Sequence, residues 1–166
     1  IVFIDWGYNK AYDFVNHAKM LEELKVKYLL APGTSTWSSI TGRFIDMKET
    51  IENSTCSSKK YHGLGILLTD WGDMGHLQYL PSSYLGFIYG AMLSWSSGTI
   101  EDAEKYLAII LNDETLAKVI VELSHYHELE GEYRDYGTRL FASIMWAEHG
   151  RRQDDKVNFF LNRMKS

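Results

Sequence analysis

The stretch that decides the fold is Gly63–His76, which runs Gly-Leu-Gly-Ile-Leu-Leu-Thr-Asp-Trp-Gly-Asp-Met-Gly-His. Its apolar part, Gly65–Leu68, lies between a glycine and a polar turn that contains two more glycines. A short apolar run bounded in this way is typical of a strand buried on both faces, as in a parallel sheet. Glycines let the turn bend sharply and bring its side chains to one point. We therefore expect a buried strand followed by a loop that carries chemistry.

That loop contains Asp70, Trp71, Asp73 and His76 within seven residues. An aromatic ring beside two carboxylates suits a sugar, because the C–H face of the sugar packs on the ring and its hydroxyls donate to carboxylate oxygens. The alternative is an ordinary polar loop with a packed tryptophan. This stretch alone favours neither.

Two earlier segments repeat the same layout. Ile1–Ile4 is an apolar strand followed by Asp-Trp-Gly-Tyr, and Val26–Ala31 is another strand, followed by a hydroxyl-rich loop that contains Trp37. Apolar residues at helical spacing predict helices over residues 10–24, 42–53 and 83–95, the last with a close-packing face of Gly86, Gly90 and Ala91. Alternation of strands and helices predicts an α/β fold with a parallel sheet.

The remaining chain has no strand pattern. We expect helices over residues 100–111, 113–129, 138–149 and 156–164, so that residues 1–96 form an α/β part and residues 97–166 a helical domain. Asp113 and Glu114 stand at a helix start, where acids favour the helix dipole, and we interpret them as capping residues.

Each of the three predicted strands ends in a loop with one tryptophan: Trp6, Trp37 and Trp71. Ligands of parallel α/β folds bind at the carboxyl ends of the strands. The three rings are therefore expected to line one pocket, although packing alone would also explain a tryptophan at such a position.

Composition excludes several classes of function. The chain has 166 residues, 45% of them hydrophobic, and a formal net charge of −5. It contains no basic cluster, which argues against nucleic acid as a partner, and no apolar run long enough to span a membrane. Its single cysteine, Cys56, allows no internal disulfide. His125 and His127 would lie on different faces of a helix, so we expect no metal bound between them. No metal site and no cofactor are expected elsewhere in the chain.

Several blocks taken together resemble a known family. They are Asp5–Tyr8, Ala31–Trp37, Gly42-Arg43, Thr69–His76, Leu80-Pro81 and Gly86–Trp95. In these blocks the chain is similar to bacterial glycoside hydrolase family 20, the exo-acting β-N-acetylhexosaminidases, and above all to the streptococcal-type N-acetyl-β-D-glucosaminidases with a helical C-terminal domain. The resemblance covers residues 1–96; the helical tail agrees in position and character only.

The resemblance implies a (β/α)8 TIM barrel of which this chain supplies the last third, strands 6–8 with their helices. A full barrel takes about 250 residues, so the implied partner is the N-terminal remainder of the same enzyme. The bare strand at Ile1 raises the same expectation. The helical domain would buttress the barrel or make a homodimer contact.

The mechanism implied by the resemblance is substrate-assisted and retaining. The 2-acetamido oxygen of the substrate attacks the anomeric carbon, a Glu protonates the leaving oxygen, and the preceding Asp orients the acetamido group. That Asp-Glu pair belongs to barrel strand 4, upstream of this chain, so no catalytic residue is assigned here. The substrate would be a glycan with a terminal β-linked GlcNAc or GalNAc.

The resemblance implies a sugar-binding role for five residues. Trp71 would form a wall of the terminal-sugar pocket, Asp73 would bind its outer hydroxyls, and Trp6 would help to enclose the acetamido group. Tyr8 or Trp37 would replace the Tyr that many relatives carry after strand 7. Supporting contacts are expected from Asp5, Asp70 and His76.

Two alternatives stay open. One is a carbohydrate-binding protein on a degenerate barrel without hydrolysis. The other is a structural fragment whose tryptophans are merely packed and whose exposed strand edges promote self-association. The expected location is the cytoplasm or the cell surface of a bacterium, as a soluble protein.

Overall fold

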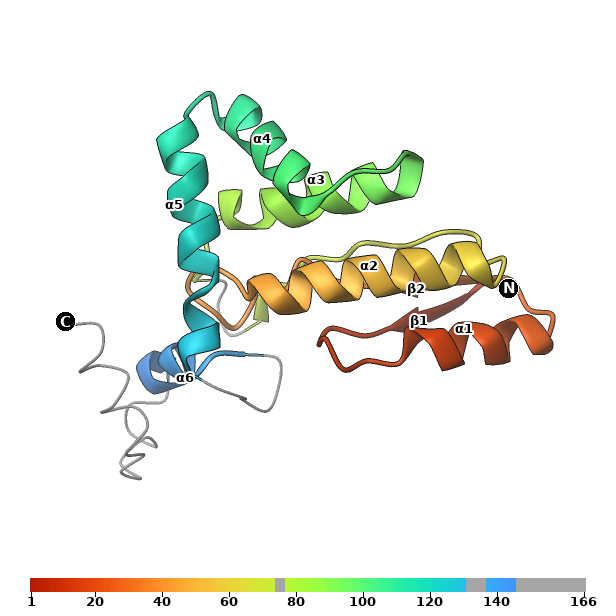
Figure 1. Cartoon of the computed structure of the whole chain (residues 1–166). Helices are drawn as coiled ribbons and strands as arrows, with labels where there is room; N and C mark the ends of the chain where they lie inside the picture. Colours follow the sequence, from red (N-terminus) through yellow and green to blue (C-terminus); the bar gives the residue numbers. More distant parts are fainter. Residues whose placement is uncertain (74–76, 131–136, 146–166) are drawn as a thin grey trace.

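The computed structural model describes residues 1–73, 77–130 and 137–145. Two short strands alternate with helices in the first part of the chain, and helices alone follow (Figure 1). The elements are β1 (Phe3–Trp6), α1 (Phe14–Glu23), β2 (Tyr28–Ala31), α2 (Phe44–Lys60), α3 (Pro81–Trp95), α4 (Ile100–Leu111), α5 (Glu114–Ser124), the 3-10 helix η2 (Tyr126–Glu130) and α6 (Arg139–Met145).

The strands β1 and β2 are parallel, as the alternation of strands and helices predicts. Phe3 lies opposite Tyr28, and Trp6 lies opposite Ala31. Helices α1 and α2 contact one another, and both contact β2. The loops that follow Trp6 and Ala31 therefore lie at the same end of the sheet, where α2 begins.

The third predicted strand pairs with β2 but is irregular. Residues 64–69 run parallel to β2 through two isolated bridges, Leu30–Ile66 and Gly33–Thr69. Pro32 has no N–H to donate, so the ladder is interrupted between the bridges. The carbonyls of Tyr28 and Leu30 accept from the N–H groups of Leu64 and Leu67. A step of two residues along β2 therefore matches a step of three residues along the third segment. The extra residue makes a bulge at Gly65, whose φ of +140° favours glycine.

Helix boundaries differ from the predicted ones where polar side chains bond locally. Helix α1 begins at Phe14 rather than near Lys10, because the side chain of Asp13 caps it by accepting from the N–H of Asn16. Helix α2 continues to Lys60 instead of ending near residue 53. Its serines stay helical because their hydroxyls have acceptors: Ser54 bonds the carbonyl of Ile51, and Ser58 bonds that of Gly65.

Helix α3 packs closely against the sheet through its glycines. A Cβ on Gly86 would lie 3.2 Å from the Cα of Thr34, and one on Gly90 would lie 2.8 Å from a methyl group of Leu68. The close-packing face predicted for these two glycines is therefore confirmed. Ala91, which was expected on the same face, is exposed, so that assignment is wrong.

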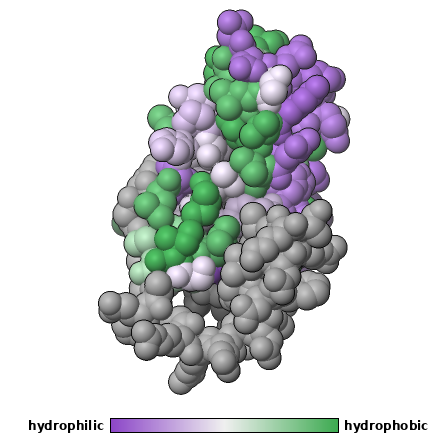
Figure 2. All heavy atoms as spheres, turned by 90° about the vertical axis from the view of Figure 1, so that its left-hand side faces the viewer, coloured by the Kyte–Doolittle hydropathy of each residue, from purple (hydrophilic) through white to green (hydrophobic). Residues whose placement is uncertain are grey.

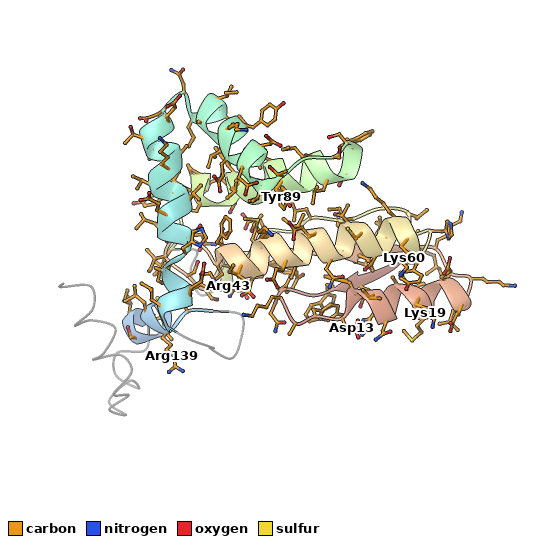
Figure 3. All side chains as sticks on the ribbon, viewed as in Figure 1. Asp13, Lys19, Arg43, Lys60, Tyr89 and Arg139 are labelled. Atoms are coloured by element: carbon orange, nitrogen blue, oxygen red, sulfur yellow. The ribbon has the colours of Figure 1, made fainter. Side chains whose placement is uncertain are left out.

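One apolar core joins the two parts of the chain. It is built from α2, α3, α4 and α5, with Ile51, Leu85 and Leu107 among its buried members. Tyr89 lies between α3 and α2 (Figure 3) and donates its hydroxyl to Glu52 at 2.5 Å; burial, with the nearby Glu52, raises the pKa of this phenol. The expected boundary at residues 96–97 falls between α3 and α4, and this core crosses it.

The helical part follows its predicted start signals. Thr99 and Asp102 form a capping box at α4, which covers the predicted residues 100–111. Asp113 accepts from the N–H of Leu116, so its predicted capping role is confirmed. The helix expected over 113–129 is wrong beyond Ser124, where α5 ends and a 3-10 turn follows. Residues 146–149 and the helix predicted over 156–164 lie outside the described residues.

Apolar side chains remain exposed on several elements of the described structure, β1 and α5 among them. Within the described residues β1 pairs only with β2, and its Phe3 and Ile4 are about half exposed, at 49% and 53%. On α5, Leu116, Val119 and Leu123 are exposed at helical spacing; Figure 2, which faces this side of the molecule, shows a hydrophobic band there. Three parallel segments cannot close a barrel by themselves, so the barrel remains a prediction. The dimer contact also remains a prediction.

Candidate sugar-binding site

Four aromatic rings meet at the carboxyl ends of the parallel segments. Tyr8 is at their centre: its ring stacks on Trp6 with centroids 5.4 Å apart and meets Trp37 and Trp71 edge-on at 5.0 and 6.1 Å. The three tryptophans thus come together, through a tyrosine, but Trp37 is buried and not on a pocket wall as was predicted. We call Trp6, Tyr8, Trp37 and Trp71 the aromatic cluster.

The rings of the aromatic cluster differ in exposure. Trp6 is 56% exposed and Trp71 46%, whereas Tyr8 is 7% exposed and Trp37 only 2%. Two indoles therefore offer surface to a ligand, while the other two rings support them from below.

Trp37 is held by Gly33 and Arg43. A Cβ on Gly33 would lie 2.4 Å from the ring of Trp37, so only a glycine lets the indole lie against the backbone there. The guanidinium of Arg43 lies over the ring, 5.3 Å from its centroid. Arg43 is buried and forms an ion pair with Asp46 at 3.3 Å. This packing makes Trp37 a support for the cluster and leaves little of its ring for a sugar.

Trp71 is fixed by hydrogen bonds at both its side chain and its backbone. Its indole N–H donates to the hydroxyl of Thr69 at 3.1 Å, and its carbonyl accepts from the amide nitrogen of the buried Gln78 at 3.0 Å. Asp73, two residues later, is exposed on the same loop. His76 lies outside the described residues.

Asp70 ties three segments of chain together. One carboxylate oxygen accepts from Thr34 at 2.5 Å and from Thr36 at 2.9 Å, and the other accepts from Ser83 of α3 at 3.0 Å. All three donors are buried. The carboxylate thereby joins the loop that carries Trp37, the loop that carries Trp71 and the first turn of α3.

Asp5 contacts residues outside the aromatic cluster. It accepts from the hydroxyl of Tyr12 at 2.7 Å and lies 3.1 Å from Nδ1 of His17 on α1. Gly7 lies directly against the ring of Tyr12, since a Cβ there would be 2.2 Å from it. Asp5 thus positions α1 and the backbone beside Trp6, and its partners lie outside the aromatic cluster.

Sequence reasoning missed four residues that hold the cluster: Gly33, Arg43, Gln78 and Ser83. The sequence predicts a polar loop with several hydroxyls over residues 34–39. Nothing in that pattern indicates that Thr34 and Thr36 share the carboxylate of Asp70. No sequence pattern signals that a buried arginine will stack on a tryptophan six residues earlier.

The described residues contain no group of three side chains able to hold a metal ion. His125 bonds Glu128, and its ring packs against Phe44 at 4.0 Å. Nδ1 of His127 bonds the carbonyl of Ser124 at 2.9 Å, and burial lowers the pKa of this imidazole. The two histidines have separate partners, but they do not share the helix that was predicted, because His125 is the C-cap of α5 and His127 lies in η2.

A groove of about 850 Å³ lies between α4 and α5, lined in part by Glu104, Ile109, Ala117 and Val121. None of its lining residues belongs to the aromatic cluster. We therefore build the candidate site on the cluster and its exposed neighbour Asp73.

No known family model matches the chain, and no curated protein or solved structure does either. Among the described residues, no helix is both long and apolar enough to span a membrane.

Proposed function

We propose that this chain supplies the sugar-binding wall of an exo-β-N-acetylhexosaminidase, which removes non-reducing terminal β-linked GlcNAc or GalNAc from glycans. The observation that carries the proposal is the convergence of Trp6, Tyr8 and Trp71 at the carboxyl ends of parallel segments. This end is where enzymes built on parallel α/β folds bind their ligands.

The exposed groups match the chemistry of a pyranose. The indoles of Trp6 and Trp71 offer apolar faces for the C–H groups of the sugar ring or for the acetamido methyl. The carboxylate of Asp73 can accept two hydroxyl hydrogen bonds. Aromatic faces combined with one acceptor group give both affinity and orientation.

The acid that protonates the leaving group is expected from the N-terminal remainder of the enzyme. Within the described residues, Asp113 and Glu114 stand at the start of α5, where Asp113 caps the helix. They belong to the helical part and line the groove between α4 and α5. Catalysis would therefore need both portions of the barrel.

The test is reconstitution. The 166-residue chain is mixed with the preceding portion of the gene product, and release of p-nitrophenol from p-nitrophenyl N-acetyl-β-glucosaminide is measured, with each portion alone as a control. Activity only in the assembled mixture supports the proposal. Activity of this chain alone would show that the acid has been placed wrongly.

A second candidate is a carbohydrate-binding protein that does not hydrolyse. It is favoured by one observation: the aromatic cluster is assembled entirely by residues of this chain. Binding of methyl N-acetyl-β-glucosaminide by an assembled mixture that releases no p-nitrophenol would favour this candidate over the enzyme.

A further inference from the structure

The loop that carries Trp37 has a strained backbone on both sides of the tryptophan. Ser35 has φ of 54° and Ser38 has φ of 51°, in the left-handed region that non-glycine residues seldom occupy. Such residues persist only where surrounding contacts hold them, and they are common at functional sites. The contacts of this loop therefore show what keeps Trp37 in place.

The first half of the loop is held by the α/β part. The carbonyl of Ser35 accepts from the N–H of Arg43 at 3.0 Å. Thr34 and Thr36 donate to Asp70, as described above. These bonds fix the chain up to Trp37.

The second half is held by the helical part, from more than eighty residues away in the sequence. The N–H of Ile40 donates to the hydroxyl of Tyr126 at 3.1 Å, and the carbonyl of Ser38 accepts from the N–H of Thr138 at 3.0 Å. The hydroxyls of Tyr126 and Thr138 bond one another at 2.7 Å, and Thr41 donates to the carbonyl of Leu123 at 2.8 Å. Figures 1 and 3 show α5 and α6 beside the start of α2, near Arg43.

The same loop supports the exposed rings. Trp37 meets Tyr8 edge-on at 5.0 Å, and Tyr8 in turn stacks on Trp6 and meets Trp71. A displacement of Trp37 therefore removes the support beneath the two indoles that face solvent.

We propose that the hydroxyl of Tyr126, which is paired with that of Thr138, is a positioning group for the aromatic cluster, because it bonds the backbone of the Trp37 loop at Ile40. That the cluster binds a sugar depends on the function proposed above. The positioning of Trp37 by Tyr126 does not depend on it. The helical part would then tune the sugar site without touching the sugar.

The experiment uses the whole chain labelled with 5-fluorotryptophan, whose ¹⁹F signals are assigned by single Trp→Phe variants. Tyr126→Phe removes the hydroxyl that bonds Ile40. Thr138→Val removes the partner of that hydroxyl and the acceptor of the Phe141 N–H, and it keeps the backbone bond to Ser38. We expect both to shift or broaden the Trp37 signal while leaving that of Trp95 unchanged. Each should weaken binding of methyl N-acetyl-β-glucosaminide about five- to tenfold, the scale of one buried hydrogen bond.

Two matched controls separate positioning from a general loss of stability. Thr138→Ser keeps the hydroxyl, and Tyr106→Phe removes a phenol hydroxyl from a residue of α4 that is 52% exposed. Both should leave the Trp37 signal and the affinity unchanged. If Tyr126→Phe does not fold, Thr41→Val tests the same loop by removing only the bond to Leu123.

An unchanged Trp37 signal in folded Tyr126→Phe and Thr138→Val would overturn the inference. A shifted Trp37 signal, together with no binding of sugar by the wild-type chain assembled with the preceding portion, would uphold the positioning and refute the assigned ligand. The two proposals thus fail separately.

Discussion

The ring of Tyr8 lies almost parallel to that of Trp6, with 24° between their planes and 5.4 Å between their centroids. Tyr8 is buried and Trp6 is largely exposed. The indole of Trp6 therefore has one face towards solvent, while its other face packs on the buried ring of Tyr8. Preorganised rings of this kind bind at low entropic cost, because they are already in place before the ligand arrives.

Trp71→Ala should weaken binding of methyl N-acetyl-β-glucosaminide by about 1–2 kcal/mol, through loss of one stacking face. Trp95→Ala is the matched control, since Trp95 is 92% exposed and ends α3, whose first turn adjoins the site. Titration followed by NMR measures both affinities. Equal affinities for the two variants would contradict the assignment of Trp71.

Asp73→Ala should reduce kcat/KM of the reconstituted enzyme by an amount equivalent to about 1–3 kcal/mol, because sugar hydroxyls lose their acceptor. Asp113→Ala is a suitable comparison. It removes the α5 cap and lowers stability by about 1 kcal/mol without touching the site. An Asp73→Ala enzyme with unchanged kcat/KM would exclude the proposed role.

Gly33→Ala should destabilise the fold by about 1–3 kcal/mol, because the new methyl would lie 2.4 Å from the rigid indole of Trp37. In Gly98→Ala the nearest atom, also at 2.4 Å, is the terminal methyl of Met92, which can rotate away. Urea unfolding compares the two variants. Equal losses of stability in Gly33→Ala and Gly98→Ala would contradict a tight contact between Gly33 and Trp37.

Asp70→Ala should cost about 1–3 kcal/mol of unfolding free energy, since three buried hydroxyls lose their common acceptor. Asp70→Asn keeps one acceptor oxygen, and the hydroxyls can reorient, so its loss should be smaller. The two midpoints of urea unfolding give the comparison. A larger loss in Asp70→Asn than in Asp70→Ala would show that the network is held in some other way.

Stability should fall as pH decreases from about 7.5 to 5.5, with His127 as one cause. Burial lowers the pKa of His127 in the folded chain below its ordinary value of 6.5. Between the two pKa values the unfolded state binds more protons, so the stabilisation is complete above 6.5 and is lost as pH falls below it.

His127→Asn isolates this effect, because the Asn amide nitrogen can replace Nδ1 in the bond to Ser124 without titrating. The variant should show a smaller decrease of thermal midpoint between pH 7.5 and 5.5 than the wild type. Parallel pH profiles for the two proteins would rule out a contribution from His127.

Much of the secondary structure could be predicted from local patterns. Apolar runs marked both strands, and Thr99 with Asp102 marked the start of α4, because capping depends on residues three positions apart. The second half of α2 could not be predicted in this way. Its serines and threonines favour other conformations in isolation. They are helical here because they are buried and because Ser54 and Ser58 bond carbonyls of Ile51 and Gly65.

The irregular third segment shows a similar limit. Its apolar run predicted a strand, and residues 64–69 do pair with β2. The break comes from Pro32 and from the bulge at Gly65, whose effects depend on which residues of the neighbouring segment lie opposite them.

The sequence by itself determined which residues stand at the carboxyl ends of the parallel segments, and therefore that Trp6, Trp37 and Trp71 would come together. The period of strands and helices is a local property, and the parallel direction follows from it. Only the tertiary structure decided that Tyr8 joins the rings, that Trp37 is buried under them, and that Tyr126 and Thr138 brace its loop. Those contacts join residues far apart in the chain, and close packing, which no local pattern encodes, selects them.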